Sequence, residues 1–263
     1  MGAAVGGELI AAGHEALWAP ADRSELTTSR ADDAGLRGVG LHELMDRSEV
    51  ILSICPPAAA EDVAGLAEGY EGIYVEANAI TPDRVDTIAS MLPAAVTVDG
   101  AIIGSPPRKG KRTTLYLAGP PEAAARVETL FAGTLVEPRT LGTRTGLASA
   151  LKLSYTTYQK TSRVLAAVAY ALAVGYGIED ELLEVAGRRP GSYLAEVDYV
   201  PKTAARAWRW GPEMLEAADA LASAGLPDEL ARAAADVLAR WPRPAGEQPV
   251  SIDEALRLLS SGE

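Results

Sequence analysis

The side chains that most often carry enzyme chemistry are scarce in this sequence. Its 263 residues include one cysteine, Cys55, and two histidines, His14 and His42. A single cysteine excludes a disulfide framework and a cysteine-based zinc site, and two histidines are too few for a histidine metal cluster. They also leave little material for a Ser-His-Asp or Cys-His nucleophile system. We therefore predict no bound metal, and we interpret Cys55 as a small packing residue rather than a nucleophile.

Glycines at the start of the chain indicate a dinucleotide site. The sequence opens with Met1-Gly2-Ala3-Ala4-Val5-Gly6. In a dinucleotide-binding unit, a strand ends in a glycine-rich turn and the next helix points its N-terminus at the pyrophosphate. Gly2 fits the third glycine of that motif, so the first strand and the first two glycines would lie before residue 1. The alternative is an ordinary amphipathic helix rich in alanine and glycine.

A basic residue follows the next predicted strand, where dinucleotide enzymes select their cofactor. The sequence there reads Ala19-Pro20-Ala21-Asp22-Arg23-Ser24. A carboxylate at this point accepts a hydrogen bond from the ribose 2′-hydroxyl, whereas an arginine pairs with a 2′-phosphate. Arg23 and Ser24 favour NADP, while Asp22 favours NAD. The alternative is that Arg23 binds no ligand and is simply a solvated arginine at the start of a helix.

The first half of the chain alternates short apolar runs with helix-like segments. Strands are predicted at 16–18, 49–54, 72–76, 95–98 and 114–118, and helices at 2–12, 58–66 and 81–91. Thr81 is a suitable N-cap for the last of these helices, with Pro82 at its first position. This alternation predicts a parallel α/β sheet of the doubly wound Rossmann type, with its first strand missing.

The second half of the chain is predicted to be entirely helical. Residues 145–174 form one long helix that stops at Gly175-Tyr176-Gly177, and its apolar positions include Val164, Leu165, Val168 and Leu172. Further helices are expected at 179–187, 193–210, 212–224 and 227–240, then an irregular tail at 241–249 and a short helix after the capping box that begins at Ser251. We therefore predict a dinucleotide-binding domain over 1–142 and a helical substrate and dimerisation domain over 143–263.

Charge and hydropathy exclude several classes of partner. The formal net charge is −12 and the sequence pI is about 4.8, the opposite of a nucleic-acid-binding footprint. No apolar run reaches the length of a membrane span, and the N-terminus lacks the features of a signal peptide. We expect a cytoplasmic protein that binds a small molecule and neither nucleic acid nor membrane.

Five segments in order resemble the β-hydroxyacid dehydrogenase superfamily, which includes 3-hydroxyisobutyrate dehydrogenase, 6-phosphogluconate dehydrogenase and imine reductases. The segments are MGAAVGGELIAAGHEALW, VILSICPPAAAEDV, YVEANAITP, VDGAIIGSPPRKGKRTTLYLAG and TGLASALKLSYTTYQK. The resemblance spans essentially the whole chain. It implies hydride transfer with a nicotinamide cofactor, bound at Gly2, Arg23 and Ser24 and along Ile54-Cys55-Pro56.

The resemblance also assigns catalytic residues. It implies that Lys152, on the long helix, is the general acid/base, which requires a pKa lowered towards the working pH by desolvation or a neighbouring cation. Thr156 stands one turn later, where the family has asparagine. Asn78 stands where the family has a serine. We expect Thr156 and Asn78 to orient the lysine or the substrate.

Departures from the family pattern bear on the substrate. Ile103-Gly104-Ser105 occupies the substrate-binding Ser-Gly-Gly position, so the first serine is replaced by isoleucine, and the family's late lysine has no clear counterpart. These changes count against a 3-hydroxyisobutyrate-type substrate and favour a bulkier, less acidic or more apolar one. The leading interpretation is an NADP-preferring oxidoreductase for a β-hydroxyacid or a related carbonyl or imine. The second is a non-catalytic binding or interaction protein with a dinucleotide fold, because without its first strand the sheet would need new pairing.

The long helix also predicts assembly. It is apolar on more than one face, and the few helices that follow are too few to cover it. The family resemblance implies intertwined helical domains. We therefore expect a homodimer with an active site built from both chains.

Overall fold

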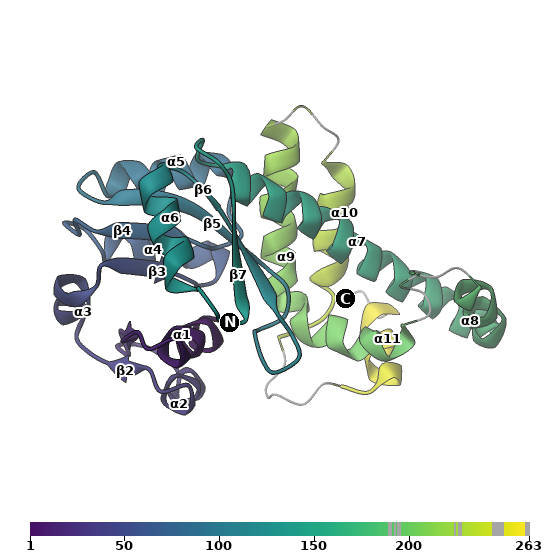
Figure 1. The fold of residues 1–263 in the computed structure, drawn as a ribbon. Helices are drawn as coiled ribbons and strands as arrows, with labels where there is room; N and C mark the ends of the chain where they lie inside the picture. The colour runs from purple at the N-terminus through teal and green to yellow at the C-terminus, as the bar shows by residue number, and fades with distance from the viewer. Residues whose placement is uncertain are drawn as a thin grey trace. The chain divides into compact units, whose positions relative to one another are not determined.

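A computed structural model describes residues 1–188, 191, 193, 196–223, 225, 228–243 and 250–260. The chain divides into two compact units, Met1–Lys152 and Leu153–Glu263. The division falls inside a helix, whereas the sequence predicted a junction near Gly142. The predicted order of an α/β half followed by an all-helical half is confirmed (Figure 1).

The first unit is built around a five-stranded sheet in the order β3-β4-β5-β6-β7. The pairs β3–β4, β4–β5 and β6–β7 are parallel and β5–β6 is antiparallel, so the predicted parallel sheet is in fact mixed. The strands are β3 (Val50–Ser53), β4 (Ile73–Glu76), β5 (Val96–Ile103), β6 (Thr113–Ala118) and β7 (Val136–Gly142). In the three parallel strands β3, β4 and β5, the carboxyl ends meet at one edge, which is where open α/β sheets bind ligands.

Helices cover both faces of this sheet. One face packs against α1 (Gly2–Ala11) and α6 (Pro121–Leu130), with Val5, Val98 and Val127 in a shared core. The other face packs against α4 (Ala60–Gly65), which continues the turn η1 (Pro57–Ala59), and α5 (Pro82–Met91). The Thr81 hydroxyl accepts a hydrogen bond from the backbone N–H of Arg84, which confirms the predicted N-cap.

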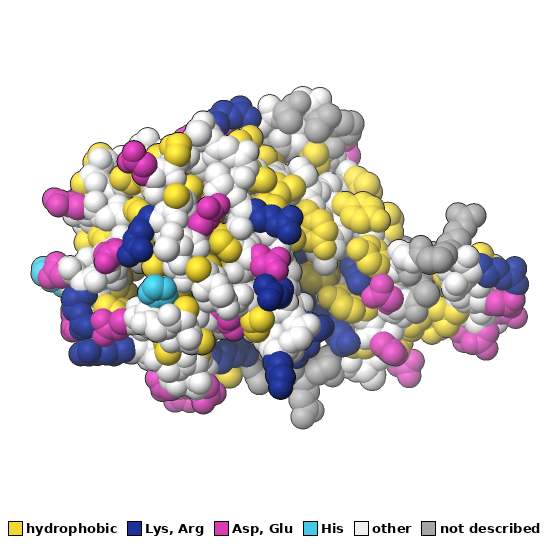
Figure 2. Space-filling view, viewed as in Figure 1, with side chains coloured by type: hydrophobic (Ala, Val, Ile, Leu, Met, Phe, Trp, Pro, Cys, Tyr) yellow, Lys and Arg dark blue, Asp and Glu magenta, His cyan; other side chains and the backbone are white. Residues whose placement is uncertain are grey.

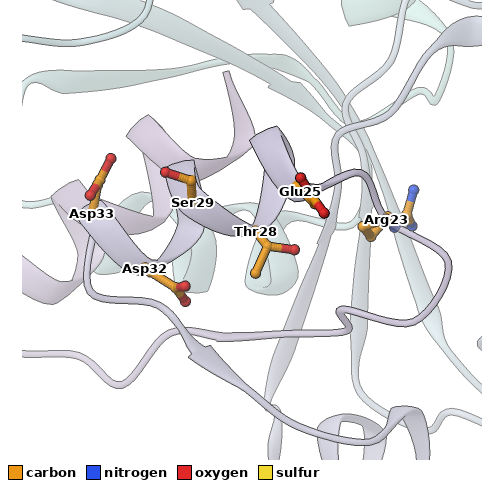
Figure 3. Close-up of a pocket in the computed structure, with 6 residues that line it drawn as sticks. All are labelled: Arg23, Glu25, Thr28, Ser29, Asp32 and Asp33. Atoms are coloured by element: carbon orange, nitrogen blue, oxygen red, sulfur yellow. The ribbon is translucent and has the colours of Figure 1, made fainter.

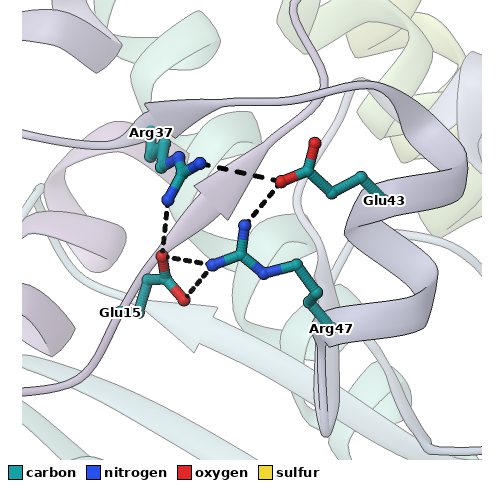
Figure 4. A network of polar contacts seen from close by, with 4 residues as sticks. All are labelled: Glu15, Arg37, Glu43 and Arg47. Atoms are coloured by element: carbon teal, nitrogen blue, oxygen red, sulfur yellow. Dashed lines mark hydrogen bonds and ion pairs between the residues drawn. The ribbon is translucent and has the colours of Figure 1, made fainter.

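Two very short strands form a separate sheet. The strands are β1 (Leu17–Trp18) and β2 (Arg37–Gly38), which pair in parallel, and among the described residues no ladder joins them to β3. Helix α2 (Glu25–Asp33) connects them, and α3 (Leu41–Arg47) leads on to β3. Figure 4 shows what holds this segment together: Glu15 binds Arg37 and Arg47, at 3.4 and 2.6 Å, and both arginines also bind Glu43.

The second unit consists of helices around an alanine-rich core. They are the rest of α7 (Leu147–Tyr176), α8 (Glu179–Gly187), the turn η3 (Val197–Tyr199), α9 (Val200–Ser223), α10 (Glu229–Leu238) and α11 (Ile252–Ser260). Ala204, Met214 and Leu238 are buried in that core. The predicted capping box at Ser251 is confirmed, since its hydroxyl accepts the Glu254 N–H.

One predicted break is wrong. The sequence indicated separate helices on either side of Gly211-Pro212, but α9 continues through Pro212. Proline removes one backbone donor from a helix interior and crowds the preceding turn. The buried residues Trp210 and Met214 flank this point, so their packing holds the two segments in one helix. The predicted helix start at Pro227, the tail at 244–249 and the side chains of Val168 and Leu172 lie outside the described residues.

Candidate active site

Asn78 joins the carboxyl ends of β3 and β4. Its side-chain oxygen accepts a hydrogen bond from the Cys55 N–H at 2.6 Å, and its side-chain nitrogen donates to the Ser53 hydroxyl at 3.0 Å. The backbone N–H of Asn78 donates to Glu76 Oε1 at 3.0 Å. Asn78 is buried, so these contacts form a fixed clamp that sets the path of the chain after β3.

Cys55 is held in that clamp as a neutral thiol. Burial raises its pKa to about 11, and the nearby Glu76 carboxyl adds to the rise. A thiol with such a pKa is a poor nucleophile, because the thiolate is the reactive form. This environment agrees with a packing role. The charge of Arg23 acts in the opposite direction on the same thiol, so Arg23 lies near enough to the β3 end to influence it.

Two buried carboxyl groups lie beneath this edge of the sheet. Glu76 on β4 is the register partner of both Ser53 on β3 and Asp99 on β5, so the three side chains share one face. Asp99 accepts hydrogen bonds from the backbone N–H groups of Ala148 and Ser149, at 2.8 and 3.1 Å, and from the Ser149 hydroxyl at 2.6 Å. It therefore caps the N-terminus of α7, where an acidic group is favoured by the helix dipole.

The cap orients the first turns of α7, which carry Lys152. The Lys152 ammonium donates a hydrogen bond to the backbone carbonyl of Ile102, near the carboxyl end of β5. The predicted substrate segment Ile103-Gly104-Ser105 follows directly. Lys152 and this segment are thus brought together at one strand end. Thr156 lies one turn further along α7, at the start of the second unit.

Gly104 has a conformation that few other residues tolerate. Its φ is +134°, and a Cβ there would lie 2.6 Å from the Thr113 hydroxyl oxygen. That hydroxyl in turn donates to the Ile103 carbonyl at 3.2 Å. The turn after β5 is therefore fixed by close backbone approach, and glycine at this position is a steric requirement.

The N-terminus of α1 lies at the same edge of the sheet. A Cβ at Gly2 would lie 3.9 Å from both the Cβ and the carbonyl oxygen of Ile54, which is ordinary contact. Close packing therefore does not require glycine at position 2. Gly6 is the tighter position, because a Cβ there would lie 3.0 Å from Leu36. Backbone N–H groups at a helix start can bind phosphate, and these are placed beside the Ile54-Cys55-Pro56 turn.

The segment predicted to select the cofactor forms the rim of an open pocket of about 470 Å³. Figure 3 shows Arg23 at one end and Asp32 and Asp33 at the other. The Ser24 hydroxyl accepts the Thr27 N–H at 3.3 Å and so serves as the N-cap of α2. Glu25 also lines the pocket, on the Arg23 side, so the lining carries three carboxylates and one guanidinium.

Sequence reasoning missed Glu76 and Asp99. Both lie in apolar strands. Asp99 meets its donors through a helix 50 residues away, and Glu76 meets Ser53 and Asp99 through strand pairing, although its hydrogen bond from the Asn78 N–H is local. The available signal is one acidic residue in an otherwise apolar strand, at the end of β4 and in the middle of β5. The same pattern also fits an acidic side chain exposed to solvent.

Several known proteins are similar to this chain in sequence or in fold. Residues 173–241 match the model of a domain of unknown function, DUF1932. An uncharacterized 28.5 kDa protein in the 7S RNA 5′ region of Methanothermus fervidus is 29% identical over 177 residues, which is 66% of this chain and 68% of that protein. A conserved protein of unknown function, whose structure reveals similarity with 3-hydroxyacid dehydrogenases, has a TM-score of 0.66 and 26% identity over 90% of this chain and 92% of its own.

Enzymes of known activity share the same architecture. The 3-hydroxyisobutyrate dehydrogenase of Mycobacterium tuberculosis, solved with L-serine, has a TM-score of 0.69 and 18% identity, covering 99% of this chain and 96% of that one. A reductive aminase from Aspergillus terreus, solved with NADPH and ethyl levulinate, has a TM-score of 0.57 and 18% identity, covering 98% and 95%. The chain therefore has the β-hydroxyacid dehydrogenase fold along essentially its whole length, as its motifs predicted.

Proposed function

We propose that this protein is an NADP-preferring oxidoreductase that acts on a β-hydroxyacid or on a related carbonyl or imine, with Lys152 as general acid/base. The observation that carries the proposal is the convergence at one sheet edge of Lys152, the Gly104 turn and the Asn78–Cys55 clamp. The structural neighbours that are named dehydrogenases or reductases support the reaction class.

The residues at this edge fit a dinucleotide. The start of α1 offers backbone N–H groups beside the Ile54-Cys55-Pro56 turn, and Arg23 supplies a positive charge on the same side. An arginine binds a phosphate with two parallel hydrogen bonds, which favours NADP over NAD. NAD remains the alternative, through Asp22. The bound nicotinamide would supply the hydride chemistry, which no side chain provides.

The chain's own contribution is to hold the substrate and to move a proton. The Lys152 side chain is partly buried with its ammonium near the strand end. As an ammonium it can donate a proton to a substrate oxygen or nitrogen in that region, and as a neutral amine it can accept one. Asn78 fixes the neighbouring strand end, and Gly104 and Ser105 offer backbone and hydroxyl groups to the substrate. Ile103 stands where the family has a serine, so one hydroxyl that could bind a substrate carboxylate is absent. This favours a less acidic substrate.

We also propose a homodimer. Helix α7 exposes large apolar side chains, notably Tyr158 at 64% and Leu165 at 55%. Figure 2 shows hydrophobic side chains gathered on the visible face of the helical unit. A second copy of the chain would cover them, because exposed apolar patches of this kind mark association surfaces.

Titration with NADPH and NADH tests the proposal directly. Nicotinamide fluorescence should increase on binding, with NADPH binding more tightly than NADH. The β1–β2 sheet is separate from β3 in the described residues, so binding also tests whether this arrangement forms a competent site. If neither cofactor binds, the non-catalytic interpretation replaces this one. If NADH binds as tightly as NADPH, the preference for NADP is wrong, but the proposal of a nicotinamide-dependent oxidoreductase stands.

A further inference from the structure

The hairpin that joins β5 to β6 carries positive charge that the proposed function does not use. Arg108, Lys109, Lys111 and Arg112 place four of the chain's 24 lysines and arginines close together. No aspartate or glutamate occurs over 100–121, although the chain has 36 of them and a formal net charge of −12. Figure 2 shows Lys and Arg side chains over this hairpin. The hairpin is therefore a basic segment of an acidic protein.

A tight turn holds these charges in place. Arg108 and Lys111 exchange backbone hydrogen bonds of 3.2 and 2.7 Å, and Gly110 between them adopts a φ of +80°. The loop therefore consists of Lys109 and Gly110 alone, which is the commonest length for a hairpin turn. Arg108 and Lys111 lie directly opposite each other, where like charges are destabilising. Stability of the hairpin thus does not account for its charges.

Little in the protein neutralises this segment. Arg112 forms an ion pair with Glu137 at 3.0 Å. Among the described residues, no ion pair joins Arg108, Lys109 or Lys111 to a carboxylate, and all three are exposed. Solubility does not explain them either, because each one brings the net charge closer to zero. These three cations are therefore available to an anion from solution.

The hairpin continues the pair of strands that Lys152 contacts. The Lys152 ammonium donates to the Ile102 carbonyl, and Ile102 is the register partner of Leu115 across β5 and β6. Arg108 follows Ile102 by six residues, so at about 3.6 Å per residue their Cα atoms are at most about 22 Å apart. The Debye length is about 30 Å at 0.01 M ionic strength and about 8 Å at 0.15 M. The cations therefore attract an anion towards this strand end, and salt weakens the attraction.

We propose that this basic hairpin attracts a substrate that has an anionic group, a carboxylate or a phosphate, to the strand end that carries Lys152. The inference rests on the proposed function, because it assigns a substrate class to the same site. A surface of one sign of charge raises the association rate of a ligand of the opposite sign. Ile103 supplies no hydroxyl at the turn itself, so the anionic group lies on the hairpin side of the substrate, away from the atom that reacts.

The cofactor is the other source of an anionic group. Its phosphates are assigned to the start of α1 and to Arg23, beside the turn that follows β3. In the sheet, β4 separates β3 from β5 and β6, and neighbouring strands are about 4.8 Å apart. The basic hairpin thus lies two strands or more from the phosphate positions and on the strands that Lys152 contacts. These positions favour the substrate over the cofactor.

A matched pair of substrates tests the proposal. A keto acid and its ethyl ester differ by one negative charge. The ratio of kcat/KM for the acid to kcat/KM for the ester should fall as the ionic strength rises from about 0.01 M to about 0.15 M. The variant Lys109→Gln/Lys111→Gln should lower the low-salt ratio several-fold, through the kcat/KM of the acid. An unchanged ratio in this variant would overturn the proposal.

The matched control is Arg37→Gln/Arg126→Gln, which changes the net charge by the same amount. Both arginines are exposed. Arg37 begins β2, and Arg126 binds Glu49 just before β3, so both lie at amino ends of strands, whereas Lys152 contacts a carboxyl end. The control should keep the wild-type ratio. An equal fall in both variants would show a general effect of net charge and would also overturn the role of the hairpin.

Two binding measurements identify the source of the anionic group. The affinity for NADPH should be the same in Lys109→Gln/Lys111→Gln as in the wild type. A loss as large as the fall in the substrate ratio would assign the hairpin to the cofactor and overturn the substrate role. Nuclear magnetic resonance of the full chain with inorganic pyrophosphate needs no turnover. The amide signals of Lys109 and Gly110 should shift at low salt in the wild type, and the variant should lose the shift at Gly110.

These results also separate the inference from the proposed function. If the hairpin signals shift with pyrophosphate but no oxidoreductase activity is found, the anion site stands and the proposed function fails. If the protein reduces both substrates with a ratio that does not depend on the hairpin, the proposed function stands and the inference fails. Hairpin signals that do not respond to pyrophosphate at low salt would likewise overturn the inference, whatever the activity.

Discussion

The Ser149 hydroxyl donates a hydrogen bond of 2.6 Å to Asp99, and this contact ties the start of α7 to the middle of the sheet. Both residues are fully buried. Hydrogen bonds to charged groups contribute about 1.5–3 kcal/mol, so Ser149→Ala should lower the free energy of unfolding by roughly that amount. Urea denaturation measures the change. Ser154→Ala, at an exposed position on the same helix, is the matched control and should change stability by less than about 0.5 kcal/mol.

This contact shows where prediction from sequence ends. The long helix over 145–174 was predicted within two residues at each end, because its apolar periodicity and its glycine stop are local signals. The Asp99 cap was not predicted, because it depends on a strand register that joins residues 50 positions apart. Local sequence patterns thus predict helices and strands. The pairing of strands decides which buried polar side chains lie in contact.

The missed strands have a similar explanation. β7 contains Pro138 and polar residues at alternate positions, which are typical of an edge strand and weak as a strand signal. β2 has only two residues. For the site, Lys152 came from a family resemblance, and the structure adds its contact with Ile102. The Asn78 clamp could not be predicted, because Ser53 and Cys55 reach it from another strand.

Cofactor preference should depend on Arg23. Arg23→Ala should weaken NADPH binding by about 1.5–3 kcal/mol, the range for hydrogen bonds to charged groups, and should barely change NADH binding. Fluorescence titration of both cofactors measures the difference. Arg139→Ala, at an exposed arginine on β7, should leave both affinities unchanged. If Arg23→Ala weakened NADPH and NADH binding equally, Arg23 would not be the residue that binds the 2′-phosphate.

Stability should fall as the pH rises through the neutral range. The pKa of Glu76 is about 7 in the folded protein, against an ordinary value of 4.5, so the folded state binds more protons between these values. The free energy of unfolding therefore decreases from about pH 4.5 and loses roughly 3 kcal/mol once the pH exceeds 7. Burial also raises the pKa of Asp99, which acts in the same direction.

Glu76→Gln isolates the contribution of Glu76 to this slope. The variant cannot ionise, so its urea-denaturation free energy should decline less with pH than that of the wild type, and the two curves should differ most above pH 7. Parallel curves for the two proteins would show that Glu76 has an ordinary pKa.

Assembly should depend on the exposed face of α7. Light scattering at micromolar concentration should give the mass of a dimer. Leu165→Glu places a charge on an exposed apolar position, so it should shift the protein towards monomer while the helix itself remains stable. Glu181→Gln, at an exposed position on α8, is a control that should leave the mass unchanged. A monomeric wild type would contradict the homodimer.

Turnover should depend on Lys152 as a proton-transfer group. Lys152→Met keeps roughly the volume and removes the ammonium, and general acid–base groups contribute typically about 10²- to 10⁴-fold, so turnover should fall by that factor. Lys152→Arg should not restore activity, because a guanidinium does not deprotonate near neutral pH. Cofactor affinity should be unchanged in both variants.

The control for this experiment is Lys202→Met, at an exposed lysine on α9. It should retain wild-type turnover, because it changes the net charge of the protein by the same amount as Lys152→Met without touching the strand end. Steady-state kinetics with NADPH and a panel of carbonyl and imine substrates measures all three variants. Full activity in Lys152→Met would exclude the lysine mechanism, since the hydrogen bond to Ile102 would then be a structural contact alone.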